Sequence, residues 1–298
     1  MAGATETGRV QCWAWRVHGI SVRGHRHAQQ GMPCQDSWGK ARTGPPDARI
    51  TVLAVADGAG SRPRSQEGAR LAIQLATSVF GARLGHEKGV QRDAKGIPRD
   101  ADDLRLQLRG AFLEVLDAFL DGTRELSGGS ANGSADFATT LTVVVLGSGW
   151  LGYASLGDGF VVLRAGEVNG AAQFHLLPQP EEESEYGNET TFLSSADAAL
   201  KVQIACVRDD GVDGVLLSTD GLAQAALSRL PGPRPAANSS FAAAVLRSLD
   251  RPGPDPEADA QALEALLLSD RLTALNADDK TLVRAVRTAG GRDGGERP

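Results

Sequence analysis

Cysteine is scarce in this sequence of 298 residues, and the few cysteines present exclude two kinds of small-protein scaffold. Cys12, Cys34 and Cys206 are odd in number, widely separated and form no C-x-x-C pair. Such a set supports neither a disulfide framework nor a zinc site built from cysteines. We therefore expect reduced thiols, as in a cytoplasmic protein.

Long apolar runs are also missing. No stretch approaches the roughly 18 apolar residues of a membrane-spanning helix, and the N-terminal region lacks the apolar core of a secretory signal. These absences predict a soluble, cytoplasmic protein that makes no contact with membranes. Residues 1–9 are small and polar, and residues 289–298 are rich in Gly, Arg and Asp. We expect them to form a loose leader and a disordered tail around a single domain at residues 10–288.

Clusters of positive charge are absent as well. The net charge is −6, and no run rich in Lys and Arg is interleaved with aromatic residues. Because nucleic-acid phosphates are neutralised by clustered cations, the sequence argues against a nucleic-acid partner. It also lacks the G-x-x-x-x-G-K-[ST] nucleotide-binding loop and the G-x-S-x-G elbow of serine hydrolases.

What the sequence does contain is a strand-like run that ends in a carboxylate. I-T-V-L-A-V-A, residues 50–56, carries no charge and is rich in β-branched and small side chains, which predicts a buried strand. Asp57 ends the run, and Gly58 and Gly60 follow. A carboxylate at this place is costly unless a cation meets it, and Mg²⁺ and Mn²⁺ prefer oxygen ligands. An ordinary Asp-Gly turn is the alternative interpretation.

A similar position marks four further carboxylates, each at the end of a predicted strand or in the tight turn beside one: Asp36, Asp158, Asp220 and Asp278. Carboxylates that converge repel one another unless cations lie between them. Two metal ions held by shared carboxylates are a standard arrangement for phosphoryl chemistry. The sequence therefore predicts a two-metal site, with independent surface turns as the alternative.

Strand patterns outnumber helical ones, and the helices fall in pairs between groups of strands. Helical periodicity predicts helices near residues 69–85, 102–120, 222–230, 239–249 and 257–272. Three strands within residues 139–164 are joined by short turns, which predicts an antiparallel meander. Residues 126–136 are expected to be a flexible connection, and residues 178–190 an exposed acidic flap. Helices that do not alternate with each strand favour an α+β sandwich over a doubly wound sheet.

Six motifs follow one another in the order C-Q-D-S, V-A-D-G-A-G-S, T-T-L-T-V-V-V, S-L-G-D-G, L-L-S-T-D-G-L and D-D-K-T-L. This ordered set, from about Trp15 to Val286, resembles the metal-dependent (type 2C, PPM) serine/threonine protein phosphatases, in particular their shorter bacterial branch. The resemblance implies an α+β fold, a four-layer α-β-β-α sandwich of two antiparallel sheets flanked by helix pairs.

The same resemblance implies an activity, cofactors and partners. The activity is hydrolysis of phosphoserine and phosphothreonine on proteins by a water that two Mn²⁺ or Mg²⁺ ions activate, with a third ion in some members. The partners are a phosphorylated protein substrate and a cognate Ser/Thr kinase in bacterial signalling. We expect the protein to act as a monomer.

The resemblance also assigns roles to individual residues. It makes Asp57 the ligand that bridges both ions and lets Gly58 offer its backbone carbonyl. Asp220 and Asp278 complete the ligands of the first ion.

The resemblance gives a second group of residues a less direct role at the metal ions. Gln35 and Asp36 stand where the family has a Glu-Asp pair that acts mainly through metal-bound waters, and Asp158 matches the position of the third ion. Gln35 carries one negative charge fewer than Glu, so we expect weaker affinity for the second ion. Asp57 and Asp36 are the predicted catalytic carboxylates.

The largest departure from the family concerns an Arg that grips the substrate phosphate, because Gly31 and Met32 occupy its usual neighbourhood. We predict that His27, in H-R-H further upstream, is a phosphate binder or general acid, since His can protonate a leaving alkoxide. A plain polar loop is the alternative, and a zinc pair lacks a third soft ligand. The departures leave open a catalytically weak or inactive phospho-binding scaffold, and a metal hydrolase of small phosphoesters is a third hypothesis.

Two residues next to the predicted ligands keep two interpretations each. Asp279 stands where the family commonly has Asn, and it either adds a ligand or is solvated. Cys34, which precedes Gln35, is either a redox-sensitive thiol or a packing residue.

Overall fold

The computed structural model describes residues 13–45, 49–85, 100–130, 133–178, 190–209, 211–228, 235–252 and 255–289. The expected leader at residues 1–9, nearly all of the expected tail and most of the expected acidic flap lie outside these ranges. Within them, no helix is both long and apolar enough to cross a membrane.

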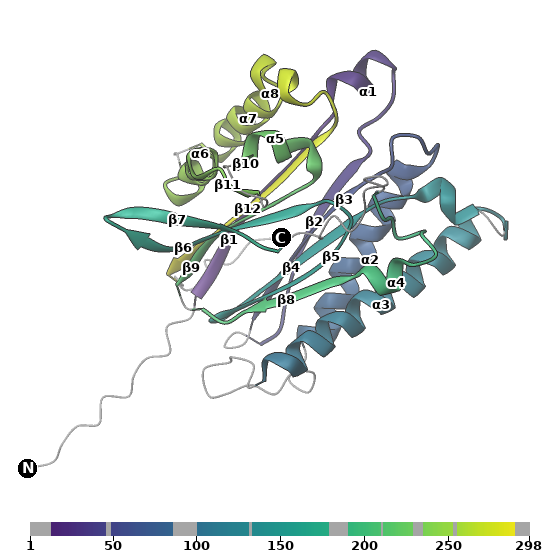
Figure 1. The fold of residues 1–298 in the computed structure, drawn as a ribbon, viewed down its shortest axis with the longest axis horizontal. Coiled ribbons are helices and arrows are strands. Elements are labelled where there is room, and N and C mark those ends of the chain that lie inside the picture. Colours follow the sequence, from purple (N-terminus) through teal and green to yellow (C-terminus); the bar gives the residue numbers. More distant parts are fainter. Residues whose placement is uncertain are drawn as a thin grey trace, which may run out of the picture.

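Two five-stranded antiparallel sheets form the centre of the fold (Figure 1). The first sheet has the strand order β1 (Trp13–Val22), β12 (Lys280–Ala289), β9 (Val212–Ser218), β6 (Phe160–Val168) and β7 (Ala171–Leu176). The second has the order β2 (Asp36–Thr43), β3 (Ile50–Asp57), β4 (Leu141–Gly147), β5 (Trp150–Leu156) and β8 (Gln203–Val207). Strands adjacent in space are therefore often far apart in the chain.

Helices cover the outer face of each sheet, which confirms the predicted four-layer α-β-β-α sandwich (Figure 1). The second sheet is covered by α2 (Ser65–Gly85) and α3 (Ala101–Leu126), and the first by α6 (Ser239–Asp250), α7 (Pro256–Leu267) and α8 (Asp270–Leu275). The shorter elements are α1 (His25–Gln29), η1 (Gly133–Phe137), α4 (Ala198–Lys201), η2 (Asp220–Leu222), α5 (Ala223–Ala226), β10 (Leu227–Ser228) and β11 (Ala236–Ala237).

Strand β3 shows why its sequence has no polar alternation. Val52 and Ala54 pack against the helices of their own side, whereas Leu53 and Val55 pack into the core between the two sheets. Both faces of the strand are thus buried, and a strand buried on both faces is apolar throughout. Asp57 is the position at which β3 leaves this double core.

The predicted three-strand meander is wrong. β4 and β5 pair with each other, but β6 pairs with β7 and β9 in the other sheet. The turn at residues 157–159 therefore crosses from one sheet to the other. Gly157 adopts φ +103, and a Cβ there would lie 2.5 Å from the Thr140 side chain. This crossing places Asp158 at the junction of the sheets.

Three predicted segments also differ in length. Helix α3 continues to Leu126, and η1 occupies part of the expected flexible connection. The helix expected at residues 222–230 is reduced to the single turn of α5. The helix expected at residues 257–272 is two helices, because the Ser269 side chain accepts a hydrogen bond from the Leu272 N–H and starts α8.

Candidate metal centre

The predicted carboxylates lie at one end of the sandwich. Asp36 begins β2 directly opposite Asp57, which ends β3. On the other sheet, Ser218 at the end of β9 pairs with Leu282 of β12 and with Phe160 of β6. The antiparallel register therefore brings Asp220, Asp278 and Asp158 to the same end as the first pair.

Asp36 is buried, with 7% of its surface exposed, and its carboxylate is held by a hydroxyl. The Thr219 hydroxyl donates to Oδ2 of Asp36 over 2.8 Å and accepts from the Thr281 N–H over 3.2 Å. Burial raises the pKa of Asp36 to about 7, and the nearby negative charge of Asp279 adds to this, while the hydroxyl of Thr219 opposes it. The Asp36 carboxylate is thus fixed in place, but its negative charge is only partly offset by its hydrogen-bond partners.

Asp57 is held through its backbone, and its carboxylate meets those of Asp36 and Asp220. Its N–H donates to the Thr140 hydroxyl over 3.0 Å, and its carbonyl accepts from the Thr139 hydroxyl over 2.9 Å. Burial raises the pKa of Asp57 well above its ordinary value, and the charges of Asp36 and Asp220 raise it further.

Asp220 and Asp158 form the other side of the cluster. Burial raises the pKa of Asp220 to about 6, and the charge of Asp158 contributes to the rise. The Thr190 hydroxyl donates to Oδ2 of Asp158 over 3.0 Å. Oδ1 of Asp158 is buried and has no hydrogen-bond partner in the part of the chain that the structure describes.

These observations together fit a divalent cation. Three carboxyl groups have raised pKa values, chiefly because burial removes their charge from water and also because other carboxylates lie near them. The segments that carry the predicted ligands also contain two buried oxygens, Oδ1 of Asp158 and Oε1 of Gln35. Neither has a hydrogen-bond partner among the described residues. A set of oxygen donors of this kind suits Mg²⁺ or Mn²⁺ better than a soft metal.

Close packing of the backbone requires glycine at position 58, in addition to the expected role of its carbonyl as a metal ligand. Its N–H donates to the Gln35 carbonyl over 3.2 Å. A Cβ at this position would lie 2.8 Å from the backbone oxygens of Gln35 and Ser65. The close approach fixes the segment of Gln35 and Asp36 against the end of β3.

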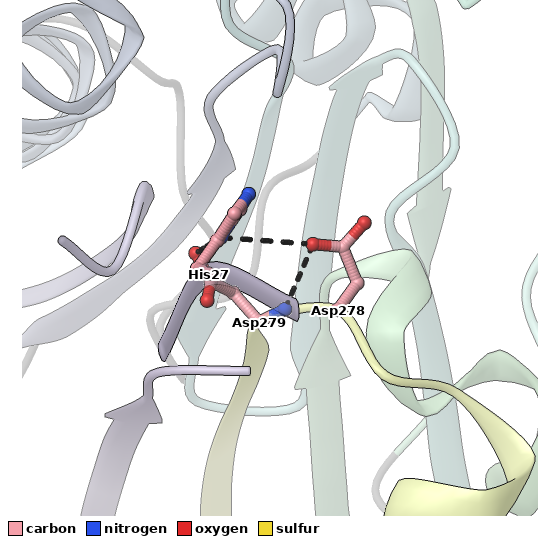
Figure 2. Close-up of side chains that lie close together, drawn as sticks. All are labelled: His27, Asp278 and Asp279. Carbon is pink, nitrogen blue, oxygen red and sulfur yellow. Dashed lines mark hydrogen bonds and ion pairs between the residues drawn. The ribbon is translucent and has the colours of Figure 1, made fainter. Parts of the chain in front are cut away.

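His27 is buried beside two carboxylates and is not part of a solvated polar loop. It lies on α1 and is 2% exposed. Its Nδ1 is 2.9 Å from Oδ2 of Asp279 and 3.8 Å from Oδ1 of Asp278, within ion-pair distance but without the angle of a hydrogen bond (Figure 2). Over the described ranges, these three residues are also a group whose potential metal-ligand atoms all lie within 4.8 Å of one another.

Asp279 is not solvated, and backbone amides occupy both of its carboxylate oxygens. It is 3% exposed, and its two carboxylate oxygens accept hydrogen bonds from the backbone N–H groups of Gly24 and Gln35, each over 2.6 Å. Its neighbour Asp278 contacts the guanidinium of Arg26 over 2.5 Å.

Sequence reasoning missed Arg26 and the buried threonines. Arg26 was passed over because it lies nine positions before Gln35, and only the folded path of the segment brings it to Asp278. Thr219 precedes the predicted ligand Asp220 in the sequence. That position next to a ligand is the one sequence feature that could have indicated that its hydroxyl contacts the site.

Comparisons with known proteins identify the family of this chain. The family model described as "Protein phosphatase 2C" matches residues 23–267. The Serine/threonine-protein phosphatase 3 of Escherichia coli (strain K12) is 28% identical over 281 residues, which cover 92% of this chain and 98% of the relative.

Solved structures are similar over nearly the whole chain. The catalytic domain of the serine threonine protein phosphatase PstP, in complex with 2 manganese ions, has a TM-score of 0.56 at 19% identity, covering 93% of this chain and 99% of that one. The serine-threonine phosphatase 2C from Toxoplasma gondii has a TM-score of 0.59 at 14% identity, with 92% and 95% covered. At these identities the similarity shows a shared fold.

Proposed function

This chain belongs to the protein phosphatase 2C family, and from that membership we propose that it hydrolyses phosphoserine and phosphothreonine on proteins with the help of two divalent metal ions. The observation that carries the proposal is the cluster of Asp36, Asp57 and Asp220, whose pKa values are raised first by burial and then by the charges of neighbouring carboxylates. Perturbed carboxyl groups gathered at one site are typical of functional centres.

The ligand set follows from the geometry and the family pattern. Asp57 would bridge the two ions, with Asp220, Asp278 and the Gly58 carbonyl beside it. Asp36 and Gln35 would serve the second ion. Asp158, whose buried Oδ1 has no hydrogen-bond partner among the described residues, would serve a third. Bound Mn²⁺ or Mg²⁺ would supply positive charge for the phosphate and lower the pKa of a water. The manganese ions of the PstP complex, a structure of the same fold, support this choice of metal.

The residues of the chain would bind and orient the substrate around that centre. Asp57 and Asp36 would accept hydrogen bonds from the attacking water and so direct it at phosphorus. Arg26 and His27 belong to α1 and approach the segment after Asp57 at Gly60. A Cβ at Gly60 would be 3.4 Å from Nη2 of Arg26 and 3.8 Å from Nε2 of His27, so both groups face the same point. The guanidinium would hold the phosphate oxygens, and His27 would donate a proton to the leaving alkoxide.

The nature of the substrate and partners completes the proposal. We expect a phosphorylated protein substrate, a cognate Ser/Thr kinase that the enzyme opposes, and a cytoplasmic monomer. Arg26 supplies a cation near the site, which could replace the missing Arg both in a phosphatase and in a phospho-binding scaffold, so turnover is what separates the two.

The test is phosphate release from a phosphothreonine peptide with Mn²⁺ present. We expect turnover by the wild type, and a loss of at least about a hundredfold in Asp57→Asn, because one bridging carboxylate is removed. Asp102→Asn is the matched control, since Asp102 carries the same charge on a side chain that is 81% exposed.

Three other outcomes would contradict the proposal. Tight binding of the phosphopeptide without turnover at saturating Mn²⁺ would identify a phospho-binding scaffold. Faster turnover of small phosphoesters than of any phosphopeptide would identify a small-molecule hydrolase. Equal activity of wild type and Asp57→Asn would remove the metal centre from the reaction.

A further inference from the structure

We propose that Asp279 is a positioning residue, whose carboxylate closes the 24–35 loop (residues 24–35) and holds it over the metal centre. The proposal rests on the proposed phosphatase function, because this loop carries Arg26, His27 and Gln35. The family resemblance offered two roles for this position, a metal ligand or a solvated side chain. The 3% exposure of Asp279 excludes the second, and the hydrogen bonds to both of its carboxylate oxygens indicate a role in holding the loop.

The contacts of Asp279 reach both ends of the loop. Oδ1 accepts from the N–H of Gly24, and Oδ2 accepts from the N–H of Gln35, each over 2.6 Å. Hydrogen bonds from N–H groups to a carboxylate are among the strong ones. One buried side chain therefore joins the first and last residues of the loop.

The same carboxylate meets the middle of the loop. Nδ1 of His27 lies 2.9 Å from Oδ2 of Asp279, and Figure 2 shows the His27 side chain close to both adjacent aspartates. His27 is 2% exposed, so its position depends on the residues that enclose it. Asp279 thus contacts the loop at its beginning, at α1 and at its end.

The backbone at Asp278 and Asp279 is tightly enclosed on two sides. A Cβ at Gly24 would lie 2.2 Å from the carbonyl carbon of Asp278, and one at Gly221 would lie 1.9 Å from the carbonyl oxygen of Asp279. The N–H of Arg26 also donates to the Ala277 carbonyl over 3.0 Å. The loop, the start of β12 and the turn after Asp220 consequently form one packed unit.

This unit separates the roles of two adjacent carboxylates. Asp278 faces Arg26 and the predicted metal ligands, whereas Asp279 is occupied by backbone amides. Asn would serve poorly at residue 279, because its amide has one acceptor oxygen and its NH₂ would face an N–H donor. Asp279→Asn should therefore release one end of the loop while it leaves Asp278 in place.

The first test measures amide hydrogen exchange in the metal-free full-length protein. In Asp279→Asn we expect the amides of Gly24 and Gln35 to exchange at least about tenfold faster than in the wild type, with the amides of β3 and β4 unchanged. Asp102→Asn, an exposed change of the same charge, should leave the loop unchanged. Unchanged exchange of Gly24 and Gln35 in Asp279→Asn would overturn the proposal.

The second variant approaches the same contact from the loop. Gly24→Ala keeps the carboxylate but places a methyl group against the Asp278 backbone. We expect the same faster exchange within the loop, and a double variant with Asp279→Asn that is no worse than the stronger single variant. Additive effects of the two changes would mean that they act separately and would overturn the proposal.

Kinetics separates positioning from general loss of structure. We expect Asp279→Asn to raise KM for a phosphothreonine peptide about tenfold, with a smaller change in kcat and in the Kd for Mn²⁺ measured by calorimetry. A fall in kcat alone, with KM unchanged, would indicate a smaller folded fraction and overturn the proposal. If the wild type itself shows no turnover, the proposed function fails, and hydrogen exchange then decides the role of Asp279 independently.

Discussion

Asp36 at the start of β2 lies directly opposite Asp57 at the end of β3, in a strand pair whose register is continuous over eight residues. Residues directly opposite each other in an antiparallel pair point to the same face, and like charges in such a pair are destabilising. Burial makes this pair costlier still, and it raises the pKa of both groups. The charges of Asp36 and Asp57 therefore destabilise the metal-free folded protein at the place where divalent cations would be bound.

Replacing Asp36 by Asn should stabilise the metal-free protein at high pH. The pKa of Asp36 is about 7 in the folded state, against about 3.9 in an unfolded chain. The folded protein thus holds more protons between these values, so its free energy of unfolding falls as pH rises from about 4 to 7.

The measurement is thermal unfolding in a chelator. Asp36→Asn should have a higher Tm than the wild type at pH 8 and the same Tm at pH 4. In a domain of this size, each kcal/mol gained in the free energy of unfolding raises Tm by about 2–4 °C. The surface change Asp102→Asn is the control. A lower Tm of Asp36→Asn at pH 8 would contradict the assignment of a destabilising charge to Asp36.

Binding of Mn²⁺ should release protons near neutral pH. Asp36 and Asp220 have pKa values of about 7 and 6, so part of each population is protonated there and must lose its proton to bind a cation. Calorimetry at pH 6.5 in two buffers of different ionisation enthalpy should show net proton release, and the Kd should rise as pH is lowered to 5.5. A Kd that is equal at pH 5.5 and 7.5 would place the ion elsewhere.

Arg26 should act on the substrate phosphate more than on the metal. Its guanidinium is about half exposed beside Asp278, which leaves it free to meet a ligand. Arg26→Ala should raise KM for a phosphothreonine peptide about tenfold, the size expected for one charge-assisted contact. Arg26→Lys should recover only part of the loss, because Lys lacks the planar fork.

The matched control for Arg26 is Arg124→Ala. Arg124 is likewise about half exposed and pairs with Asp121 on α3. Equal kinetics of the two alanine variants would exclude Arg26 from substrate binding.

Cys34 should react slowly despite its place beside Gln35. Burial raises the pKa of its thiol far above the ordinary value, and the charges of Asp279 and Asp36 add to the rise. Since the thiolate is the reactive form, iodoacetamide at pH 8 should alkylate Cys34 at least about tenfold more slowly than it does in urea. Equal rates in the folded and unfolded protein would restore the interpretation of a redox-sensitive thiol over that of a packing residue.

The sequence carried the information for β3 and for the positions of the aspartates. A strand buried on both faces is an uninterrupted apolar run, so the residue that ends it, Asp57, could be identified without a structure. The partner of β6 could not be predicted in the same way. β6 is apolar at every buried position and β5 is apolar at nearly all of them, Ser155 being an exception. The short turn at residues 157–159 fits a hairpin and a crossing equally well.

The side of the site that faces the 24–35 loop was the least predictable part. Arg26 and His27 reach Asp278 and Asp279 through contacts that span more than 250 residues of sequence. Asp278 and Asp279 are adjacent and chemically identical, yet one contacts Arg26 and the other binds backbone amides. No local pattern distinguishes them, because the distinction depends on how the segment just before β12 meets the 24–35 loop.

The most direct test of the metal centre is the anomalous difference map of a crystal soaked in Mn²⁺. We predict two peaks that share Asp57 as a common ligand, with Asp220 and Asp278 bound to one of them, at separations of about 3.5–4 Å. A single peak between His27, Asp278 and Asp279, with none beside Asp57, would contradict the account.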